Sequence, residues 1–177
     1  MRKILFVCTG NTCRSSMAEG FFSKALEDHP ILAKHFEAFS AGLMAINGNP
    51  ASANSIQVLK EEWGIDISNH KARLIKYEDI RDAYLVLTMT RNHKDAIIRM
   101  FPDTKSKVFT LKEYARGKDN DECPGKCLGN GIADDYDFSL DILDPYGMPL
   151  QTYKECAMDV KKAIDGLLRR LEQETDI

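Results

Sequence analysis

The chain has 177 residues and a mass of 20.0 kDa, which is typical of one domain with a substantial buried core. Its formal charge of -3 and isoelectric point near 5.8 disfavour a protein that binds nucleic acid mainly through phosphate contacts. Hydrophobic residues make up 44% of the chain and charged residues 29%, a composition that excludes disordered and membrane-embedded proteins.

The cysteines and the apolar segments indicate where such a protein works. Five cysteines, an odd number without an export signal, favour reduced thiols in a cytosol over a disulfide framework. The N-terminal apolar run, residues 4–8, is too short for a signal peptide, and no segment approaches the roughly 20 apolar residues of a membrane span. We therefore expect one soluble, cytoplasmic domain over residues 1–177, with neither a membrane nor nucleic acid as partner. Its oligomeric state is not predicted.

Apolar runs alternate with amphipathic segments along the chain. Strands are predicted over 3–8, 36–41, 83–89 and 107–111. Helices are predicted from Arg14 onward and over 51–63, 92–101 and 153–171. Trp63 and Cys156 fall on the apolar sides of two of these helices. This alternation predicts an α/β fold, a doubly wound, four-stranded parallel sheet with helices on both faces.

One segment interrupts the alternation. Residues 117–143 contain seven acidic residues, two lysines and four glycines. This composition predicts a long, acidic surface insert, and loops of such length are usually functional or mobile. One possible role for the insert is a lid that limits which substrates reach the functional site described below.

The most specific motif follows the first predicted strand and reads Cys8-Thr9-Gly10-Asn11-Thr12-Cys13-Arg14-Ser15. Ligands of doubly wound sheets bind at this turn, where backbone N–H groups and a helix N-terminus face an anion. Gly10 gives the turn conformational freedom, and the planar Arg14 fork can grip two oxygens of a tetrahedral dianion. The positive potential of these N–H groups, the helix N-terminus and Arg14 also favours the thiolate form of Cys8. We therefore expect Cys8 to attack phosphorus and form an S-phosphocysteine, with Ser15 stabilising the sulfur as leaving group.

A phosphoryl-transfer site also needs a proton donor for the leaving group. The predicted donor is Asp144, within Asp144-Pro145-Tyr146. Pro145 restricts the backbone of Asp144 to extended conformations, which fixes the direction of its carboxyl group. Tyr146 offers an aromatic wall beside a flat substrate group. Taken alone, Asp-Pro is also a common turn.

Together with Ser40-Ala41-Gly42 and segments 87–90 and 111–114, these motifs resemble the low-molecular-weight protein-tyrosine-phosphatase family over essentially the whole chain. The resemblance implies an enzyme that needs no metal or cofactor and acts on a phosphorylated protein or peptide. It implies that Cys8 is the nucleophile, Arg14 the transition-state clamp, and Asp144 the general acid and then base. It further implies that three residues brace the phosphate loop: Asn11, Ser40 and His70.

The substrate group is predicted from the mouth of the loop. A threonine at Thr12 resembles the bacterial members that act on phosphoarginine in proteins, whereas tyrosine-directed members tend to have a bulky apolar residue there. A small hydroxyl leaves room and a hydrogen-bonding partner for a guanidinium group. Met44 stands near where many tyrosine-directed relatives have an aromatic wall. Against this, Tyr146 can stack on phosphotyrosine. We favour phosphoarginine and keep phosphotyrosine as the alternative.

The remaining cysteines leave redox chemistry open. Cys13 either forms a reversible disulfide with Cys8 or packs beneath the loop. Cys123 and Cys127, in the acidic insert, are either a redox pair or plain loop cysteines. A thiol-linked arsenate reductase is therefore a remote alternative, although residues 88–99 lack the cysteines that such enzymes carry there. The basic cluster at 91–94 is interpreted as a solvated helix face.

Overall fold

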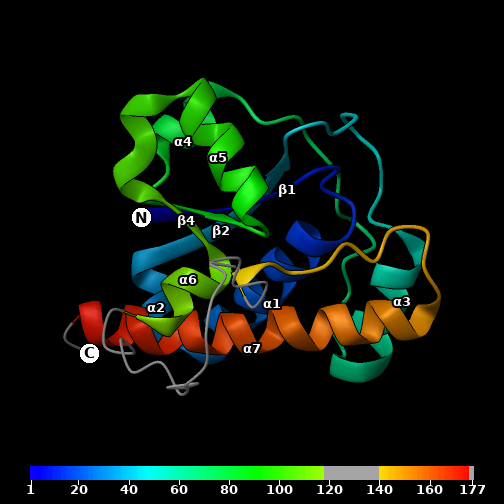
Figure 1. Cartoon of the computed structure of the whole chain (residues 1–177). Coiled ribbons are helices and arrows are strands. Elements are labelled where there is room, and N and C mark those ends of the chain that lie inside the picture. The colour runs from blue at the N-terminus through cyan, green and yellow to red at the C-terminus, as the bar shows by residue number, and fades with distance from the viewer. Residues whose placement is uncertain (118–139, 176–177) are drawn as a thin grey trace, which may run out of the picture.

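The computed structural model describes residues 1–117 and 140–175 of the chain. Most of the predicted acidic insert, including Cys123 and Cys127, lies outside the described residues. Four parallel strands form one sheet in the order β2-β1-β3-β4 (Figure 1). Their bounds are β1 Arg2–Cys8, β2 Phe36–Gly42, β3 Leu85–Thr88 and β4 Val108–Thr110. The predicted four-stranded parallel sheet is confirmed.

Helices cover both faces of the sheet, as predicted. The helices of the described residues are α1 Arg14–Asp28, α2 Pro30–His35, α3 Ala53–Trp63, α4 Tyr77–Asp82, α5 Arg91–Met100, α6 Leu111–Arg116 and α7 Leu150–Glu174, with a 3₁₀ helix at Pro102–Lys107. In Figure 1, α4 and α5 lie on one side of the sheet, and α1, α6 and the long α7 lie on the other. None of these helices is both long and apolar enough to cross a bilayer.

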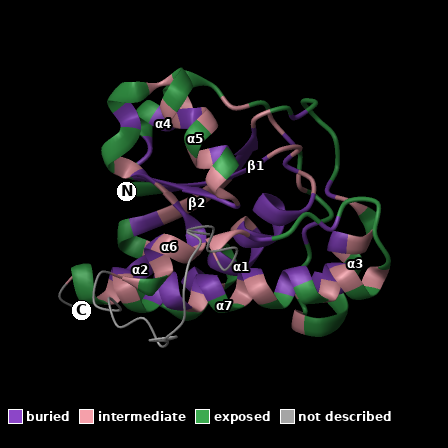
Figure 2. Ribbon diagram, viewed as in Figure 1, coloured by how far each residue is buried: buried purple, intermediate pink, exposed green. Residues whose placement is uncertain are grey.

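The central strand β1 shows why two helical layers form. Successive side chains of a strand point to opposite faces. Ile4 and Phe6 pack in the cluster formed with α1, α3, α6 and α7, whereas Leu5 and Val7 pack in the cluster formed with α4 and α5. All four side chains are fully buried, and Figure 2 shows the sheet as the purple centre of the molecule. A strand covered on both faces has to be apolar throughout, and this is the pattern that predicted it.

Three short helices were not predicted. Helices α2, α4 and α6 have six residues each, too few for the repeating apolar stripe that identifies a helix. Residue Leu111, predicted to end the last strand, instead begins α6, where Thr110 and Glu113 form a capping box. Of the two predicted core residues, Trp63 is confirmed in part and Cys156 in full. Trp63 is half-buried with its ring edge-on to Phe21, and Cys156 is buried.

Candidate active site

The loop between β1 and α1 turns around the sulfur of Cys8. The backbone N–H of Asn11 donates to Cys8 Sγ at 3.2 Å, and Ser15 Oγ lies 2.9 Å from the same atom. Cys8 is 2% exposed, at the end of β1, and Ser15 lies in the first turn of α1. A thiolate held by an amide N–H and a hydroxyl at a helix N-terminus is stabilised as an anion. The geometry therefore suits a nucleophilic sulfur.

Asn11 joins the loop to the rest of the protein. Its side chain is fully buried and donates to both Ser15 Oγ, at 2.9 Å, and Ser40 Oγ, at 2.7 Å. Its side-chain oxygen accepts from the backbone N–H of Arg73 at 3.0 Å, and its carbonyl oxygen lies 2.7 Å from His70 Nε2. The structure thus brings the three predicted bracing residues together, with Asn11 at their centre.

A second set of contacts holds those partners, and its members were not predicted from the sequence. Glu19 accepts from Ser40 Oγ and lies 3.7 Å from His70 Nδ1. Arg73 donates from Nε to the Ser40 carbonyl and pairs with Asp79 at 2.9 Å. Glu19 stands one helical turn after Ser15 on the same face of α1, a spacing that could have identified it. Arg73 and Asp79 have no comparable local signal.

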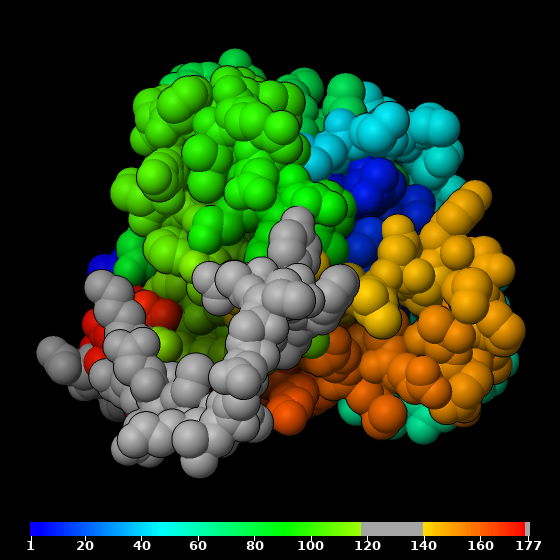
Figure 3. Space-filling view, in the orientation of Figure 1, coloured from blue at the N-terminus to red at the C-terminus, as the bar shows by residue number. Residues whose placement is uncertain are grey.

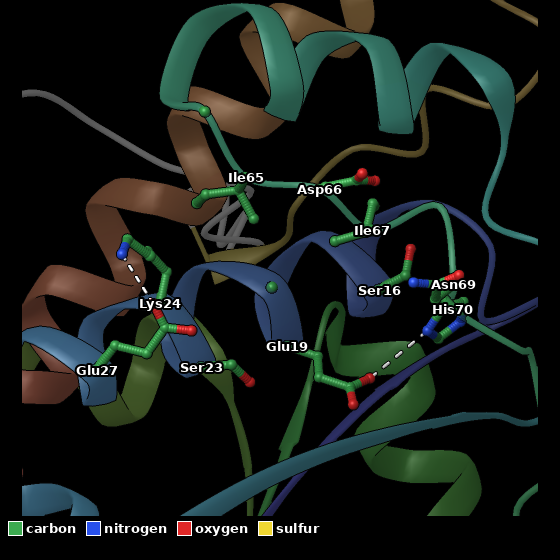
Figure 4. A pocket seen from close by; sticks show the side chains of 12 residues that line it. Ser16, Glu19, Ser23, Lys24, Glu27, Ile65, Asp66, Ile67, Asn69 and His70 are labelled. Carbon is green, nitrogen blue, oxygen red and sulfur yellow. Dashed lines mark hydrogen bonds and ion pairs between the residues drawn. The ribbon is translucent and has the colours of Figure 1, made fainter.

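A pocket of about 370 Å³ lies beside α1, behind this network. Glu19 and His70 form part of its wall, and Figure 4 shows the contact between their side chains. Lys24 and Asp66 also line it, while Cys8, Arg14 and Asp144 do not. The pocket is therefore separate from the phosphate loop and shares only bracing residues with it.

Gly42, at the end of β2, lets the neighbouring backbone approach the loop. A Cβ atom at this position would lie 2.5 Å from the carbonyl oxygen of Thr9 and 2.9 Å from the backbone nitrogen of Asn11. No real side chain tolerates such contacts with backbone, so the loop requires glycine here. The following residues continue the contact, since the Met44 N–H donates to the Thr9 carbonyl at 2.9 Å.

Arg14 and Asp144 meet although 130 positions separate them. Arg14 Nη2 donates to Asp144 Oδ2 at 2.7 Å, and Nη1 donates to the Ile142 carbonyl at 3.1 Å. The Arg14 side chain is 5% exposed and that of Asp144 is 47% exposed. Buried Arg14 Nε has no hydrogen-bond partner among the described residues. The predicted clamp and the predicted acid therefore share one site, and Nε is the guanidinium nitrogen left without a partner among the described residues.

The segment carrying Asp144 is fixed on both sides. Ile142 N donates to the Met89 carbonyl at 2.8 Å, next to the end of β3. Asp144 Oδ1 accepts from the backbone of Tyr146 at 3.2 Å, so the carboxylate also closes its own turn. These contacts help to set the direction of the Asp144 carboxylate. The restriction by Pro145 was the cause predicted from the sequence.

The predicted specificity residues lie at the rim of the site. Met44 and Tyr146 are each 76% exposed, and Thr12, in the loop, is partly exposed. In Figure 3, blue atoms of the N-terminal segment lie in a hollow between cyan, green and orange-yellow atoms.

Cys13 occupies a buried position beneath the loop. Its sulfur lies 3.4 Å from Ser52 Oγ and 3.7 Å from the hydroxyl of Tyr153, on α7. Burial, and then the hydrogen bond with Cys13, raise the pKa of Tyr153 to about 12. Both Cys8 and Cys13 are free thiols here. These contacts match the packing alternative, and the reversible disulfide stays a prediction.

The interpretation of residues 91–94 as a solvated face is wrong for His93. His93 is 8% exposed, and its Nε2 lies 2.9 Å from Thr9 Oγ1. Burial, followed by the positive charge of Arg14, lowers the pKa of His93 to about 4. The first turn of α5 packs on the phosphate loop, which a local charge pattern does not reveal. Arg91 and Lys94 are also engaged, in ion pairs with Asp141 and Glu113.

Replacing Asn11 tests the bracing network. Asn11 has a φ of 57°, so alanine would lose the side-chain hydrogen bonds and also keep a strained backbone. We expect Asn11→Ala to lower the free energy of unfolding by about 3 kcal/mol, because it leaves buried polar partners unpaired. Asn11→Gly relieves the strain and should be about 1 kcal/mol more stable than the alanine variant. Urea unfolding measures both, and equal stabilities would contradict a strained backbone.

The lowered pKa of His93 predicts how stability depends on pH. Between its ordinary value of 6.5 and about 4, the unfolded chain binds a proton that the folded protein does not. The contribution of His93 to the free energy of unfolding is therefore fully present above pH 6.5. It is lost as the pH falls toward about 4, and the loss is at most about 3 kcal/mol. Urea unfolding at about pH 7 and about pH 4.5 should show a smaller loss for His93→Gln than for the wild type. Equal losses of stability in the two proteins would contradict the lowered pKa of His93.

Comparison with known proteins identifies the family. The model of the family described as low molecular weight phosphotyrosine protein phosphatase matches residues 3–124. A protein-arginine-phosphatase of Geobacillus stearothermophilus is 38% identical over 172 residues, 97% of each chain. The low molecular weight protein-tyrosine-phosphatase PtpB of Staphylococcus epidermidis is 39% identical over 112 residues, 63% of this chain and 73% of PtpB.

A solved structure agrees with these matches. The structure of a YwlE arginine phosphatase mutant with a phosphorylated active site serine has a TM-score of 0.78 and 32% identity, over 96% of this chain and 95% of that one. With a cysteine sulfur, an arginine and a carboxylate gathered at the first loop, the chain belongs to the low molecular weight phosphotyrosine protein phosphatase family and is a cysteine-dependent phosphatase.

Proposed function

We propose that this phosphatase removes phosphoryl groups from arginine side chains of proteins, in the cytoplasm, where Cys8 and Cys13 stay reduced. The observation that carries the proposal is the similarity along 97% of both chains to a protein-arginine-phosphatase. The similarity to PtpB, at nearly the same identity, extends over 63% of this chain. That second match supports protein-tyrosine phosphatase activity as the alternative.

Thr12 supplies a physical reason for the choice of substrate. Its carbonyl oxygen accepts from the Ser52 N–H at 2.8 Å, which fixes this part of the loop beside α3. Its hydroxyl makes a long contact of 3.7 Å with Cys13 Sγ. A phosphoarginine presents polar guanidinium N–H groups next to phosphorus, and a hydroxyl can accept from them. A bulky apolar residue would instead pack against the phenyl ring of phosphotyrosine.

The proposed reaction uses three side chains: Cys8, Arg14 and Asp144. Thiolate Sγ of Cys8 attacks phosphorus while the loop N–H groups and Arg14 hold the phosphoryl oxygens. Asp144, replaced on Arg14 by the bound phosphoryl group, takes up a proton from solvent. The P–N bond then breaks, and the leaving guanidine nitrogen takes that proton from Asp144. A water molecule, giving its proton to Asp144, then attacks the S-phosphocysteine and releases inorganic phosphate. The sulfur departs as a thiolate, stabilised by the Ser15 hydroxyl that lies 2.9 Å away.

Initial rates on matched phosphoarginine and phosphotyrosine peptides test the substrate. We expect faster turnover of phosphoarginine by the wild type and loss of both activities in Cys8→Ser. Thr12→Ile should shift the ratio of kcat/KM values toward phosphotyrosine by about tenfold, because one hydrogen bond is exchanged for apolar contact. Thr12→Ser keeps the hydroxyl and is the matched control.

Three results would count against this assignment. A wild-type preference for phosphotyrosine would leave the phosphatase class intact and favour the alternative substrate. An unchanged ratio in Thr12→Ile would remove Thr12 as the specificity residue. Turnover of neither peptide by the reduced enzyme would direct attention to arsenate, the substrate of the reductase alternative.

Asp144→Asn tests the proton donor. The amide retains the shape of the carboxyl group but cannot donate or accept the proton, so we expect kcat to fall by about 10²- to 10³-fold. Asp66→Asn is the control, since Asp66 accepts from the backbone N–H of nearby Ser68 at an exposed turn, and its rate should stay within about twofold of wild type. A kcat of Asp144→Asn close to wild type would transfer the acid role to another group.

A further inference from the structure

His93 lies where the first turn of α5 packs on the phosphate loop. Strand β3 pairs with β1 in parallel, and the Met89 N–H donates to the Val7 carbonyl at 2.9 Å. The start of α5 and the start of the loop therefore share one edge of the sheet (Figure 1). The Thr90 hydroxyl caps α5 by accepting from the backbone N–H of His93 at 3.2 Å. This contact fixes the backbone position from which the His93 side chain extends.

The imidazole holds the loop residue that follows the nucleophile. His93 Nε2 lies 2.9 Å from Thr9 Oγ1, and Thr9 directly follows Cys8. The Thr9 carbonyl accepts from Met44, so neighbouring elements hold this residue by its backbone and by its side chain. Without His93, Thr9 would keep only the first of these two contacts, the hydrogen bond between its carbonyl and the Met44 N–H.

The charges around His93 keep it neutral. Arg14 of α1 disfavours a second positive charge, while Asp141 and Asp144, in the segment before α7, favour one. Burial acts with Arg14 and prevails, so the ring is neutral at neutral pH. A neutral imidazole has one N–H, and buried Nδ1 has no partner within residues 1–117 and 140–175. The tautomer that leaves no buried N–H unpaired carries its hydrogen on Nε2 and donates it to Thr9.

We propose that His93 is a positioning residue of the phosphatase reaction, acting through Thr9 to hold the first turn of the phosphate loop in its anion-binding shape. The proposal rests on the cysteine-dependent phosphatase activity and not on the choice between phosphoarginine and phosphotyrosine. Convergent loop N–H groups stabilise the transition state only when they are already oriented. Loosening Thr9 therefore weakens both the chemical step and the binding of phosphate.

Five variants test this with an aryl phosphate as substrate, so that peptide specificity does not enter. His93→Leu and Thr9→Val each remove one half of the hydrogen bond. We expect each to lower kcat/KM about tenfold and to raise the inhibition constant of inorganic phosphate by a similar factor. The double variant should lose no more than either single one, because both changes break the same contact.

Two further substitutions separate positioning from packing. A glutamine amide nitrogen can take the place of Nε2, whereas an asparagine amide reaches only the place of Nδ1. His93→Gln should therefore stay within about twofold of wild type, and His93→Asn should resemble His93→Leu. A residue that only filled space would not distinguish the two amides in this way.

Several outcomes would overturn the proposal. These are additive losses in the double variant, a His93→Gln enzyme as impaired as His93→Leu, or a lowered melting temperature with unchanged kcat/KM in the folded variants. If the wild type hydrolysed neither the aryl phosphate nor the phosphoarginine and phosphotyrosine peptides, the phosphatase assignment would fail separately. Calorimetric titration of inorganic phosphate into each variant would then still decide whether His93 shapes the loop.

Discussion

Asn11 holds the phosphate loop in a conformation that only its tertiary contacts make favourable. Its left-handed backbone, with a φ of 57°, costs a non-glycine residue about 1–2 kcal/mol. The cost is offset by buried hydrogen bonds to the hydroxyls of Ser15 and Ser40 and to the backbone of Arg73. The same conformation directs the Asn11 N–H to the sulfur of Cys8. Local strain and the anion-binding direction of this N–H are thus two aspects of one arrangement.

The sheet explains why so many distant residues reach this loop. Strands β2, β1 and β3 are parallel neighbours, so the segments that follow them emerge at one edge. β2 ends with Gly42 against the loop backbone, and α5 begins after β3 with His93 against Thr9. Each neighbour fixes a different part of the loop, which lets a short glycine-containing segment stay ordered around an anion site.

The limits of prediction from sequence follow from this assembly. Cys8, Arg14 and Ser15 form a local motif whose spacing already implies the geometry, and buried β1 follows from its unbroken apolar run. Ser40 and His70 were named only through the family resemblance, since neither residue has a distinctive neighbourhood in the chain.

The residues that were missed act entirely through distant partners. Glu19 contacts Ser40 and His70, Arg73 contacts Asn11, and His93 contacts Thr9 across 84 positions. Charge patterning suggested a solvated face for residues 91–94 because it considers the helix alone. A polar residue on the buried side of α5, four positions before Ile97, was the available signal, and it becomes decisive only when the loop packed against it is known.

Arg14 shows how the resting site is balanced for an anion. A guanidinium that is 5% exposed has to be paired, because an isolated buried charge is strongly destabilising. Asp144 and the Ile142 carbonyl meet that need on Nη2 and Nη1. A phosphoryl dianion is a better partner for Arg14 than one carboxylate, so its arrival competes with Asp144 for the guanidinium. In the proposed reaction, Asp144, whose side chain is 47% exposed, leaves Arg14 and takes up a proton before it donates to the leaving group. One ion pair therefore neutralises the buried guanidinium and, in the proposed reaction, links substrate binding to the release of Asp144.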